Sequence, residues 1–314
     1  MSGGTENYAV LLLAYGGPSA LSDVEPYLLD IRGGRPTSRE LVEEVRERYR
    51  RIGGKSPLLE RTREQAEALS RRLSRDTDGA RVYVGMRHWH PYIAEAVNEI
   101  VSDGYRTIVA LCLAPHYSQM SIGAYYDKLD AAVEAAGVPL RVQRVESWHL
   151  HPLFVDAVVE RIREALGRFS PEERDGLHVF FTAHSLPVSI RDSGDPYETH
   201  IEDTARAVAD RVGGLDWSIC YQSAGARGVP WIGPHLEEEI VRRAEAGTRS
   251  LLVAPIGFVS DHVEILYDID IEARSLAERH GVHLERTESM NASPTFIDAL
   301  AAIVLSRTER TDAS

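Results

Sequence analysis

Short runs of apolar residues recur along the chain, and most of them lack the alternation of polar and apolar positions that a half-exposed strand shows. Such runs predict strands that are buried on both faces, as in a parallel sheet covered by helices. The expected strands lie near residues 10–13, 82–84, 108–111, 140–145, 179–181, 217–220, 251–255 and 282–287. Amphipathic patterns between them predict helices over residues 59–74, 90–102, 123–136, 197–212, 235–246 and 263–279.

One stretch of sequence occurs twice. Residues 144–147 and 152–158 are echoed by residues 286–289 and 294–300, at a constant offset of 142 positions. Pro152 and Pro294 begin the second part of each copy, where proline favours the first turn of a helix. We therefore expect an internally duplicated α/β fold with two Rossmann-like lobes, each a doubly wound, mostly four-stranded parallel sheet.

The boundary between the lobes is predicted near residue 150. This divides the chain into an N-terminal lobe over 1–150 and a C-terminal lobe over 151–314. In each lobe, polar loops follow the apolar runs, so the functional side chains are expected at the carboxyl ends of the strands, facing the cleft between the lobes.

Composition and charge narrow the class of protein. Lys and Arg number 35 against 48 Asp and Glu, and the net charge of −13 argues against a nucleic acid or an anionic membrane as partner. The N-terminus lacks the pattern of a secretory signal, and no apolar run reaches the roughly eighteen residues of a membrane span, so we expect a soluble, cytoplasmic protein without an integral membrane segment. The two cysteines, Cys112 and Cys220, are too few for a four-thiolate iron–sulfur cluster and show no sign of a disulfide scaffold.

One segment is basic within this acidic chain. Residues 32–55 contain eight Lys and Arg against four Glu. Pairing along an amphipathic helix explains Arg39, Arg46 and Arg51. Arg32 and Arg48 are less easily explained in this way, and arginines at element ends often clamp carboxylates. An anionic small molecule is therefore a candidate partner.

Candidate chemistry lies after two of the predicted strands. His184 stands at the end of the strand near 179–181, and Glu264 follows the strand near 251–255. Asp268 and Glu272 continue from Glu264 at four-residue spacing, which would place the three carboxylates on one face of a helix. Either feature alone is more often structural, as a hydrogen-bonded histidine or a solvated helix face. Together they favour a site for a divalent metal and a proton, because imidazole and carboxylate both suit such metals.

Several motifs of other enzyme classes are absent. No Gly-x-Gly-x-x-Gly follows a strand, and neither a Walker lysine loop nor a Gly-x-Ser-x-Gly elbow occurs. Nicotinamide binding, nucleotide hydrolysis and serine-hydrolase chemistry therefore lose their usual support. The glycine pairs at 16–17 and 53–54 indicate either turns or close approach of the backbone to a flat ligand.

Five motifs, in order, resemble those of the ferrochelatases, most closely the soluble bacterial coproporphyrin branch. They are AYGGP at 14–18, IGGKSP at 52–57, TAHSLP at 182–187, YQS at 221–223, and GFVSDHVE at 257–264 with Tyr267 and Asp268. The resemblance covers residues 9–305. It implies insertion of Fe²⁺ into a free-base porphyrin held between the lobes. That reaction needs a base for the pyrrole protons and anionic oxygen to hold iron, and His184 and Glu264 are suited to these roles.

The resemblance also implies roles for individual residues. His184 and Glu264, in the C-terminal lobe, would be catalytic residues and metal ligands on one face of the macrocycle, with Tyr15 on the other. Asp268 and Glu272 match an outer metal site, which serves either as a path for iron or as a site for Mg²⁺. The full set of expected substrate-binding residues is Tyr15, Arg32, Arg48, Tyr49, Ser56, Tyr117, Ser118 and Tyr125. Among these, Arg32, Arg48, Tyr49 and Ser56 match positions that hold propionates.

Two features depart from the mitochondrial members of the family. Residues 32–40 form a polar stretch where those enzymes carry an apolar lip, and the chain lacks their cysteine-bearing C-terminal extension. We therefore expect a monomer with no iron–sulfur cluster or other prosthetic group. The alternatives are a chelatase for sirohydrochlorin or another tetrapyrrole, and a non-catalytic tetrapyrrole or iron carrier, against which Glu264 argues. His88 and His262 are open between a role in the site and structural hydrogen bonding.

Overall fold

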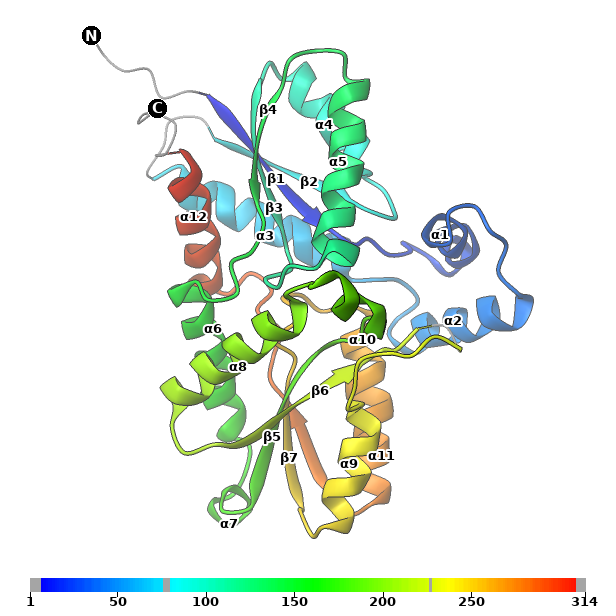
Figure 1. Cartoon of the computed structure of the whole chain (residues 1–314), viewed down its shortest axis with the longest axis vertical. Coiled ribbons are helices and arrows are strands. Elements are labelled where there is room, and N and C mark those ends of the chain that lie inside the picture. The colour runs from blue at the N-terminus through cyan, green and yellow to red at the C-terminus, as the bar shows by residue number, and fades with distance from the viewer. Residues whose placement is uncertain (1–6, 76–79, 226–227, 309–314) are drawn as a thin grey trace.

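Two parallel four-stranded sheets form the centre of the computed structural model, which describes residues 7–75, 80–225 and 228–308 (Figure 1). The first sheet, in the order β2-β1-β3-β4, consists of β1 (Tyr8–Ala14), β2 (Arg81–Met86), β3 (Thr107–Cys112) and β4 (Arg141–Val145). The second, in the order β6-β5-β7-β8, consists of β5 (Leu177–His184), β6 (Asp216–Gln222), β7 (Ser250–Ala254) and β8 (His283–Arg286). All neighbouring strands are parallel, and the two orders are equivalent.

Helices cover both faces of each sheet. Those of the first half are α1 (Val24–Ile31), α2 (Arg39–Arg51), α3 (Leu58–Leu73), α4 (Ile93–Ser102) and α5 (Ala124–Ala135). Those of the second half are α6 (Pro152–Leu166), α7 (Pro171–Arg174), α8 (Tyr197–Val212), α9 (Leu236–Glu245), α10 (Val263–Leu266), α11 (Arg274–Arg279) and α12 (Pro294–Thr308). Figure 1 shows α4 and α5 on one side of the first sheet with α3 and α12 on the other, and α9 and α11 opposite α6 and α8 around the second. The predicted duplicated, doubly wound fold is confirmed.

The sequence repeat corresponds to a structural repeat. Strands β4 and β8 begin at residues 141 and 283, and helices α6 and α12 begin at residues 152 and 294, so both pairs differ by 142 positions. The repeated segment is therefore the last strand of each sheet together with the helix that follows it.

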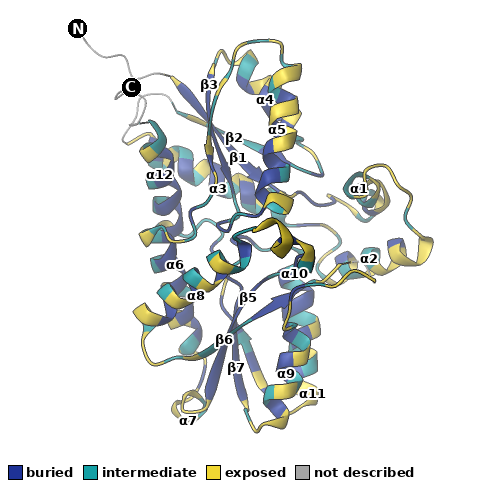
Figure 2. Cartoon of the chain, in the orientation of Figure 1, coloured by how far each residue is buried: buried dark blue, intermediate teal, exposed yellow. Residues whose placement is uncertain are grey.

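The core runs through both lobes. Leu12 of β1, Phe181 of β5 and Phe296 of α12 belong to one continuous cluster of buried apolar side chains. The first sheet ends at Val145 and the second begins at Leu177, on either side of the boundary predicted at residue 150. Helix α12 nevertheless packs against α3 and β3, so the last described helix covers the first sheet. Figure 2 shows the strands buried and the outward helix faces exposed.

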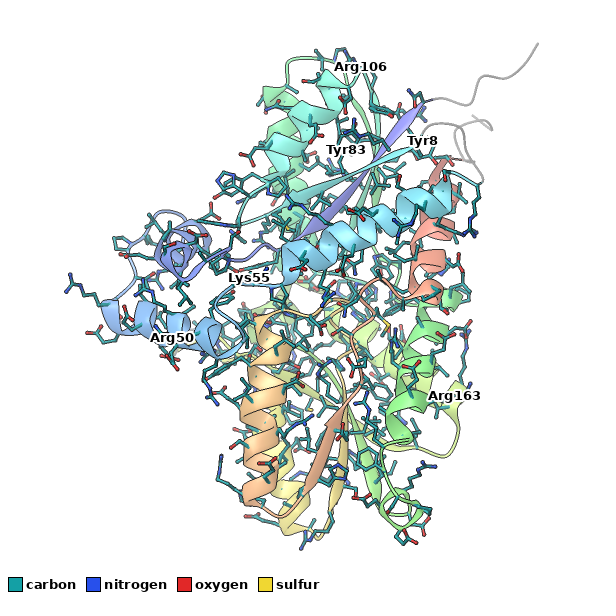
Figure 3. The ribbon with its side chains drawn as sticks, turned by 180° about the vertical axis from the view of Figure 1, so that it is seen from behind. Tyr8, Arg50, Lys55, Tyr83, Arg106 and Arg163 are labelled. Atoms are coloured by element: carbon teal, nitrogen blue, oxygen red, sulfur yellow. The ribbon has the colours of Figure 1, made fainter. Side chains whose placement is uncertain are left out.

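Helices α1 and α2 form an arm that projects from the side of the molecule opposite α12 (Figures 1 and 3). Arg50, labelled in Figure 3, lies on this arm. The guanidinium groups of Arg48 and Arg51 lie 5.4 and 5.3 Å from the ring centroid of Tyr267 in the C-terminal lobe, within range of a cation–π attraction. The basic segment is thus largely an amphipathic helix that contacts the other lobe.

The predicted helix over 263–279 is wrong in its continuity. Residues Asp268–Ala273 form a π-helical segment between α10 and α11. The amide of Glu272 donates to the carbonyl of Tyr267, five residues back, at 3.0 Å. Such π-helical turns are frequent at functional sites, and the periodicity of a sequence does not reveal them.

The ends of the chain, on which the expectations about export and about a C-terminal extension depend, lie outside the described residues. Within the part that is described, no helix is both long enough and apolar enough to cross a membrane.

Candidate active site

The candidate site lies at the point of each sheet where successive strands begin to be added on the opposite side. In the second sheet, β6 lies on one side of β5 and β7 lies on the other, and such a switch point is where open α/β sheets bind their ligands. His184 is the last residue of β5, and Glu264 lies in α10 after β7. Tyr15 directly follows β1, the equivalent strand of the first sheet. The fold therefore presents Tyr15 and His184 at strand ends, and Glu264 in the segment that follows β7.

His184 and Glu264 form a contact pair. The His184 Nδ1 atom lies 3.1 Å from Glu264 Oε2, and the two side chains are 33% and 32% exposed. Burial opposes ionisation of both groups, but their mutual attraction is stronger. It raises the pKa of His184, and with a smaller contribution from His262 it lowers the pKa of Glu264. Each group of the pair therefore stabilises the charged form of the other.

Neighbouring polar groups hold this pair in place. The Tyr197 hydroxyl donates to the His184 carbonyl at 2.9 Å, and the Gln222 amide donates to the Glu264 carbonyl at 2.8 Å. Gly257 brings the loop after β7 against β5, because a Cβ atom there would lie 2.7 Å from the Cβ of Ala183. A side chain at 257 would push the loop that precedes Glu264 away from His184.

Asp268 is buried beside the pair. Its carboxylate accepts a hydrogen bond from Ser223 and lies 3.8 Å from the Arg48 guanidinium. Burial, and then the charge of Glu264, raise the pKa of Asp268 to about 7, while Ser223 and Arg48 act in the opposite direction. Asp268 can therefore exchange a proton near neutral pH.

The four residues expected to bind metal are not equally placed. Glu272 is exposed, whereas Asp268 is 6% exposed. In residues 7–75, 80–225 and 228–308, no three His, Cys, Asp or Glu side chains converge as a ready-made metal site. The structure thus brings His184 and Glu264 together, and the extension of the metal path to Asp268 and Glu272 stays a prediction.

Tyr15 is 39% exposed and belongs to the N-terminal lobe. Its ring centroid is 4.7 Å from that of His88, and the Arg87 guanidinium is 5.9 Å from it. Burial, and then the charge of Glu264, raise the pKa of Tyr15 to about 12, with Arg87 opposing them. The negative charge of Glu264 thus disfavours ionisation of the Tyr15 hydroxyl.

The other expected substrate-binding residues fall into two groups. Tyr49, Ser56 and Tyr125 are buried, and the first and third of these are electrostatically coupled to both Tyr15 and Glu264. Ser56 packs against Gly17, where a Cβ atom would lie 2.5 Å from the serine hydroxyl oxygen. The second glycine of the first motif thus allows close packing rather than a turn.

The second group consists of expected substrate-binding residues with no described contact to Tyr15 or Glu264. Ser118 is fully buried, and its hydroxyl donates to Asp195 at 2.9 Å while it caps the following helical segment. The Tyr117 hydroxyl donates to Gln119 at 2.8 Å. Arg32 is exposed at the end of α1. Ser118 therefore has a structural hydrogen bond of its own, and Arg32 contacts none of the other expected site residues in the described hydrogen bonds and ion pairs.

Asn291 positions the site, although no sequence motif marked it. The residue has a positive φ of 41°, and its amide donates to the Val259 carbonyl at 2.9 Å. Its side chain accepts from the Asp261 amide at 3.0 Å and donates to the Asp261 carboxylate at 2.8 Å. Gln65 of α3 donates to the Asn291 carbonyl at 2.9 Å. These bonds fix the loop that leads into His262 and Glu264.

Replacement of Asn291 by alanine should therefore lower both stability and turnover. The loss of two hydrogen bonds at a partly buried site is expected to reduce the free energy of unfolding by roughly 1–3 kcal/mol. Denaturant unfolding and steady-state metallation would measure both effects, with Asn98→Ala on the exposed face of α4 as the control. Unchanged kcat in Asn291→Ala would show that the loop needs no such support.

His262 lies between the loop held by Asn291 and the His184–Glu264 pair. Its Nδ1 atom is 2.9 Å from the Ser260 carbonyl, which identifies Nδ1–H as the donor, and its Nε2 atom is 3.7 Å from Glu264 Oε2. His262 therefore contacts the Glu264 carboxylate, in addition to its structural hydrogen bond.

Two parallel sheets of equivalent strand order, as found here, form the fold of the chelatases. The chain is similar to SirB from Bacillus subtilis with Fe³⁺, at a TM-score of 0.61 and 12% identity over 98% of both chains. It is also similar to the sirohydrochlorin chelatase SirB from Bacillus subtilis subspecies spizizenii in complex with cobalt, at a TM-score of 0.59, 12% identity and 98% coverage of both. At this identity the likeness concerns the fold alone.

Sequence comparison identifies the family. The ferrochelatase family profile matches residues 7–308. The chain is 43% identical over 297 residues to a ferrochelatase of Deinococcus radiodurans, covering 94% of each chain. It is 39% identical over 302 residues to a coproporphyrin III ferrochelatase of Geobacillus sp. (strain WCH70), covering 95% of this chain and 97% of the relative. The chain belongs to the ferrochelatase family and is a metal-chelating lyase.

Proposed function

We propose that this enzyme inserts Fe²⁺ into coproporphyrin III to give coproheme, as a step of haem biosynthesis. The observation that carries the proposal is the 3.1 Å contact between His184 and Glu264, beyond the carboxyl end of the second sheet, with Tyr15 at the equivalent end of the first sheet. Relatives named coproporphyrin III ferrochelatase, at 38–40% identity, support this substrate.

In the proposed reaction the macrocycle lies between the His184–Glu264 pair and Tyr15. Fe²⁺ binds the Glu264 carboxylate and weakens its attraction for the proton on His184. That proton leaves, and the neutral imidazole then accepts a proton from a pyrrole N–H. The electron pair of the N–H bond stays on nitrogen and forms the bond to iron. Each turnover releases two pyrrole protons, with no change in the oxidation state of the metal.

Two other functions are distinguishable by the same site. A carrier that used His184 as an axial ligand would have no need of a carboxylate in contact with it, and Glu264 makes that contact. A sirohydrochlorin chelatase would prefer that less oxidised macrocycle, and the likeness to SirB concerns the fold alone. Steady-state kcat/KM for coproporphyrin III, protoporphyrin IX and sirohydrochlorin under anaerobic Fe²⁺ tests the proposal, which predicts the highest value for coproporphyrin III.

Substrate choice is proposed to depend on the cations of the arm. Arg48 is already engaged by Glu44 at 2.9 Å and by Asp268 at 3.8 Å. Arg32 is exposed, and no ion pair to it occurs among the described residues. Coproporphyrin III carries four propionates where protoporphyrin IX carries two, and guanidinium groups bind carboxylates well. Of the two arginines, Arg32 is thus the more available to a propionate.

Reversal of this charge should weaken the use of coproporphyrin III. Because solvent screens an exposed arginine, we expect Arg32→Glu to raise KM for coproporphyrin by about three- to tenfold. A tenfold change corresponds to about 1.4 kcal/mol of binding free energy. Arg50→Glu is the matched control, since Arg50 lies on the same arm and is paired with Glu47. Equal KM values in the two variants, or a kcat/KM for protoporphyrin IX at least as high as that for coproporphyrin III, would contradict this substrate assignment.

We further propose that the enzyme acts as a cytoplasmic monomer without a prosthetic group, and that Asp268 and Glu272 form the outer cation site, for iron in transit or for Mg²⁺. Cys112 and Cys220 are both buried and lie in different sheets, which supports the proposed absence of an iron–sulfur cluster. Glu272 lies at the surface and Asp268 lies beside the His184–Glu264 pair, which supports the proposed outer cation site.

A further inference from the structure

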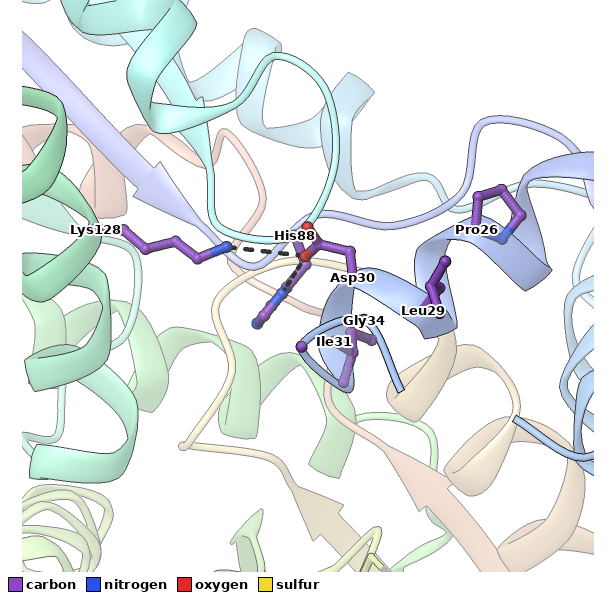
Figure 4. Close-up of a pocket in the computed structure, with 8 residues that line it drawn as sticks. Pro26, Leu29, Asp30, Ile31, Gly34, His88 and Lys128 are labelled. Atoms are coloured by element: carbon purple, nitrogen blue, oxygen red, sulfur yellow. Dashed lines mark hydrogen bonds and ion pairs between the residues drawn. The ribbon is translucent and has the colours of Figure 1, made fainter. Parts of the chain in front are cut away.

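A cavity of about 600 Å³ opens beside α1, on the side of the site where Tyr15 lies (Figure 4). Its apolar lining comes from α1, including Leu29 and Ile31. Its polar lining consists of Asp30, His88 and Lys128, which come from three different elements of the N-terminal lobe. None of these three is used by the mechanism proposed above.

Asp30 and His88 form a hydrogen-bonded pair in this cavity. The His88 Nδ1 atom lies 2.6 Å from Asp30 Oδ1, and the Lys128 ammonium lies 3.8 Å from the same oxygen. The His88 side chain is only 7% exposed. In Figure 4 its second ring nitrogen points away from Asp30, and among the described residues no hydrogen-bond partner of that nitrogen occurs.

The Asp30 carboxylate determines which nitrogen of His88 is free. A carboxylate accepts a hydrogen bond, so Nδ1 carries the proton and Nε2 keeps its lone pair, as in other histidines oriented by an aspartate. Burial lowers the pKa of His88 to about 4. The hydrogen bond to Asp30 opposes this change, and the charges of Arg87 and Lys128 add to it. His88 is therefore neutral at physiological pH, and its Nε2 lone pair is free.

We propose that Asp30 and His88 act together as a second proton acceptor for metallation, on the Tyr15 face of the macrocycle. The His88 ring lies 4.7 Å from that of Tyr15, so it lines the same face. One pyrrole proton goes to His184 and the other to His88 Nε2, and both N–H electron pairs remain on nitrogen to bind iron. Asp30 stabilises the imidazolium that forms, and the cavity allows its proton to pass to solvent. This inference rests on the proposed function.

Chemical rescue tests the pair directly. His88→Ala should lower kcat by about 10²-fold, at the low end of the loss expected for a positioned base, with KM for porphyrin changed by less than about threefold. Added imidazole should restore part of the rate, and 4-methylimidazole, which is more basic, should restore more. His90→Ala is the matched control, because His90 is also paired with a carboxylate, Glu95, but its side chain is 62% exposed.

His88→Asn separates catalysis from structure. Its amide can still donate to Asp30 in the place of Nδ1–H, but it offers no basic nitrogen. We expect His88→Asn to be as slow as His88→Ala, and Asp30→Asn to lose rate as well. Wild-type kcat in His88→Asn, or a slow His88→Ala that no imidazole rescues, would overturn the proposal. Absence of turnover in the wild-type protein would instead refute the proposed function.

Discussion

Replacement of His184 by alanine should nearly abolish metallation while leaving porphyrin binding intact. The imidazole lies at the end of β5 in contact with Glu264, and the loss of a positioned base costs on the order of 10²–10⁴-fold in rate. The fold should survive, because Tyr197 bonds to the backbone carbonyl of His184 rather than to its ring. Steady-state kcat, with porphyrin binding followed by fluorescence, measures the effect.

A suitable control for this change is His283→Ala. His283 also pairs with a carboxylate, Glu173, at 2.7 Å, but it lies at the start of β8, at the opposite end of the second sheet from the site. We expect that variant to retain wild-type kcat. If His184→Ala kept more than half of the wild-type activity, His184 would be neither the base nor an essential ligand.

The second large effect is expected at Glu264. Glu264→Gln preserves the shape of the side chain but removes the charge that stabilises protonated His184 and, in our proposal, holds iron. We expect a loss of about 10²-fold in kcat at saturating Fe²⁺, comparable to the loss of one group that stabilises a transition state. Glu272→Gln should change kcat by less than about threefold, because Glu272 is exposed and solvent screens its charge. The opposite ranking would remove Glu264 from direct contact with the metal.

Much of the fold could be predicted from the pattern of apolar residues. The strands are buried on both faces, so their sequences are continuous apolar runs, and the 142-residue offset showed that a strand and helix recur. Placing strands in order also placed His184 and Glu264, since residues at the carboxyl ends of neighbouring parallel strands meet. The contact between these two side chains follows from topology rather than from any local motif.

Features that depend on contacts between distant residues were not predicted. The π-helical segment after Tyr267 interrupts a helix whose periodicity looked regular. Asp30 and His88 are 58 positions apart, and Gln65 reaches Asn291 across 226. Helix α12 belongs by its repeat to the second lobe but packs on the first sheet. In each case packing between elements decides the outcome, and a single sequence carries no local signal of it.

The central claim is that the chain catalyses metallation rather than merely binding its ligands. The most direct test follows the loss of free-base coproporphyrin III fluorescence under anaerobic conditions, with Fe²⁺ and with porphyrin in large excess over protein. We predict that the fluorescence falls steadily through many equivalents of porphyrin for each protein molecule. A decrease that stops at one equivalent, or a rate no greater than that without protein, would contradict the account.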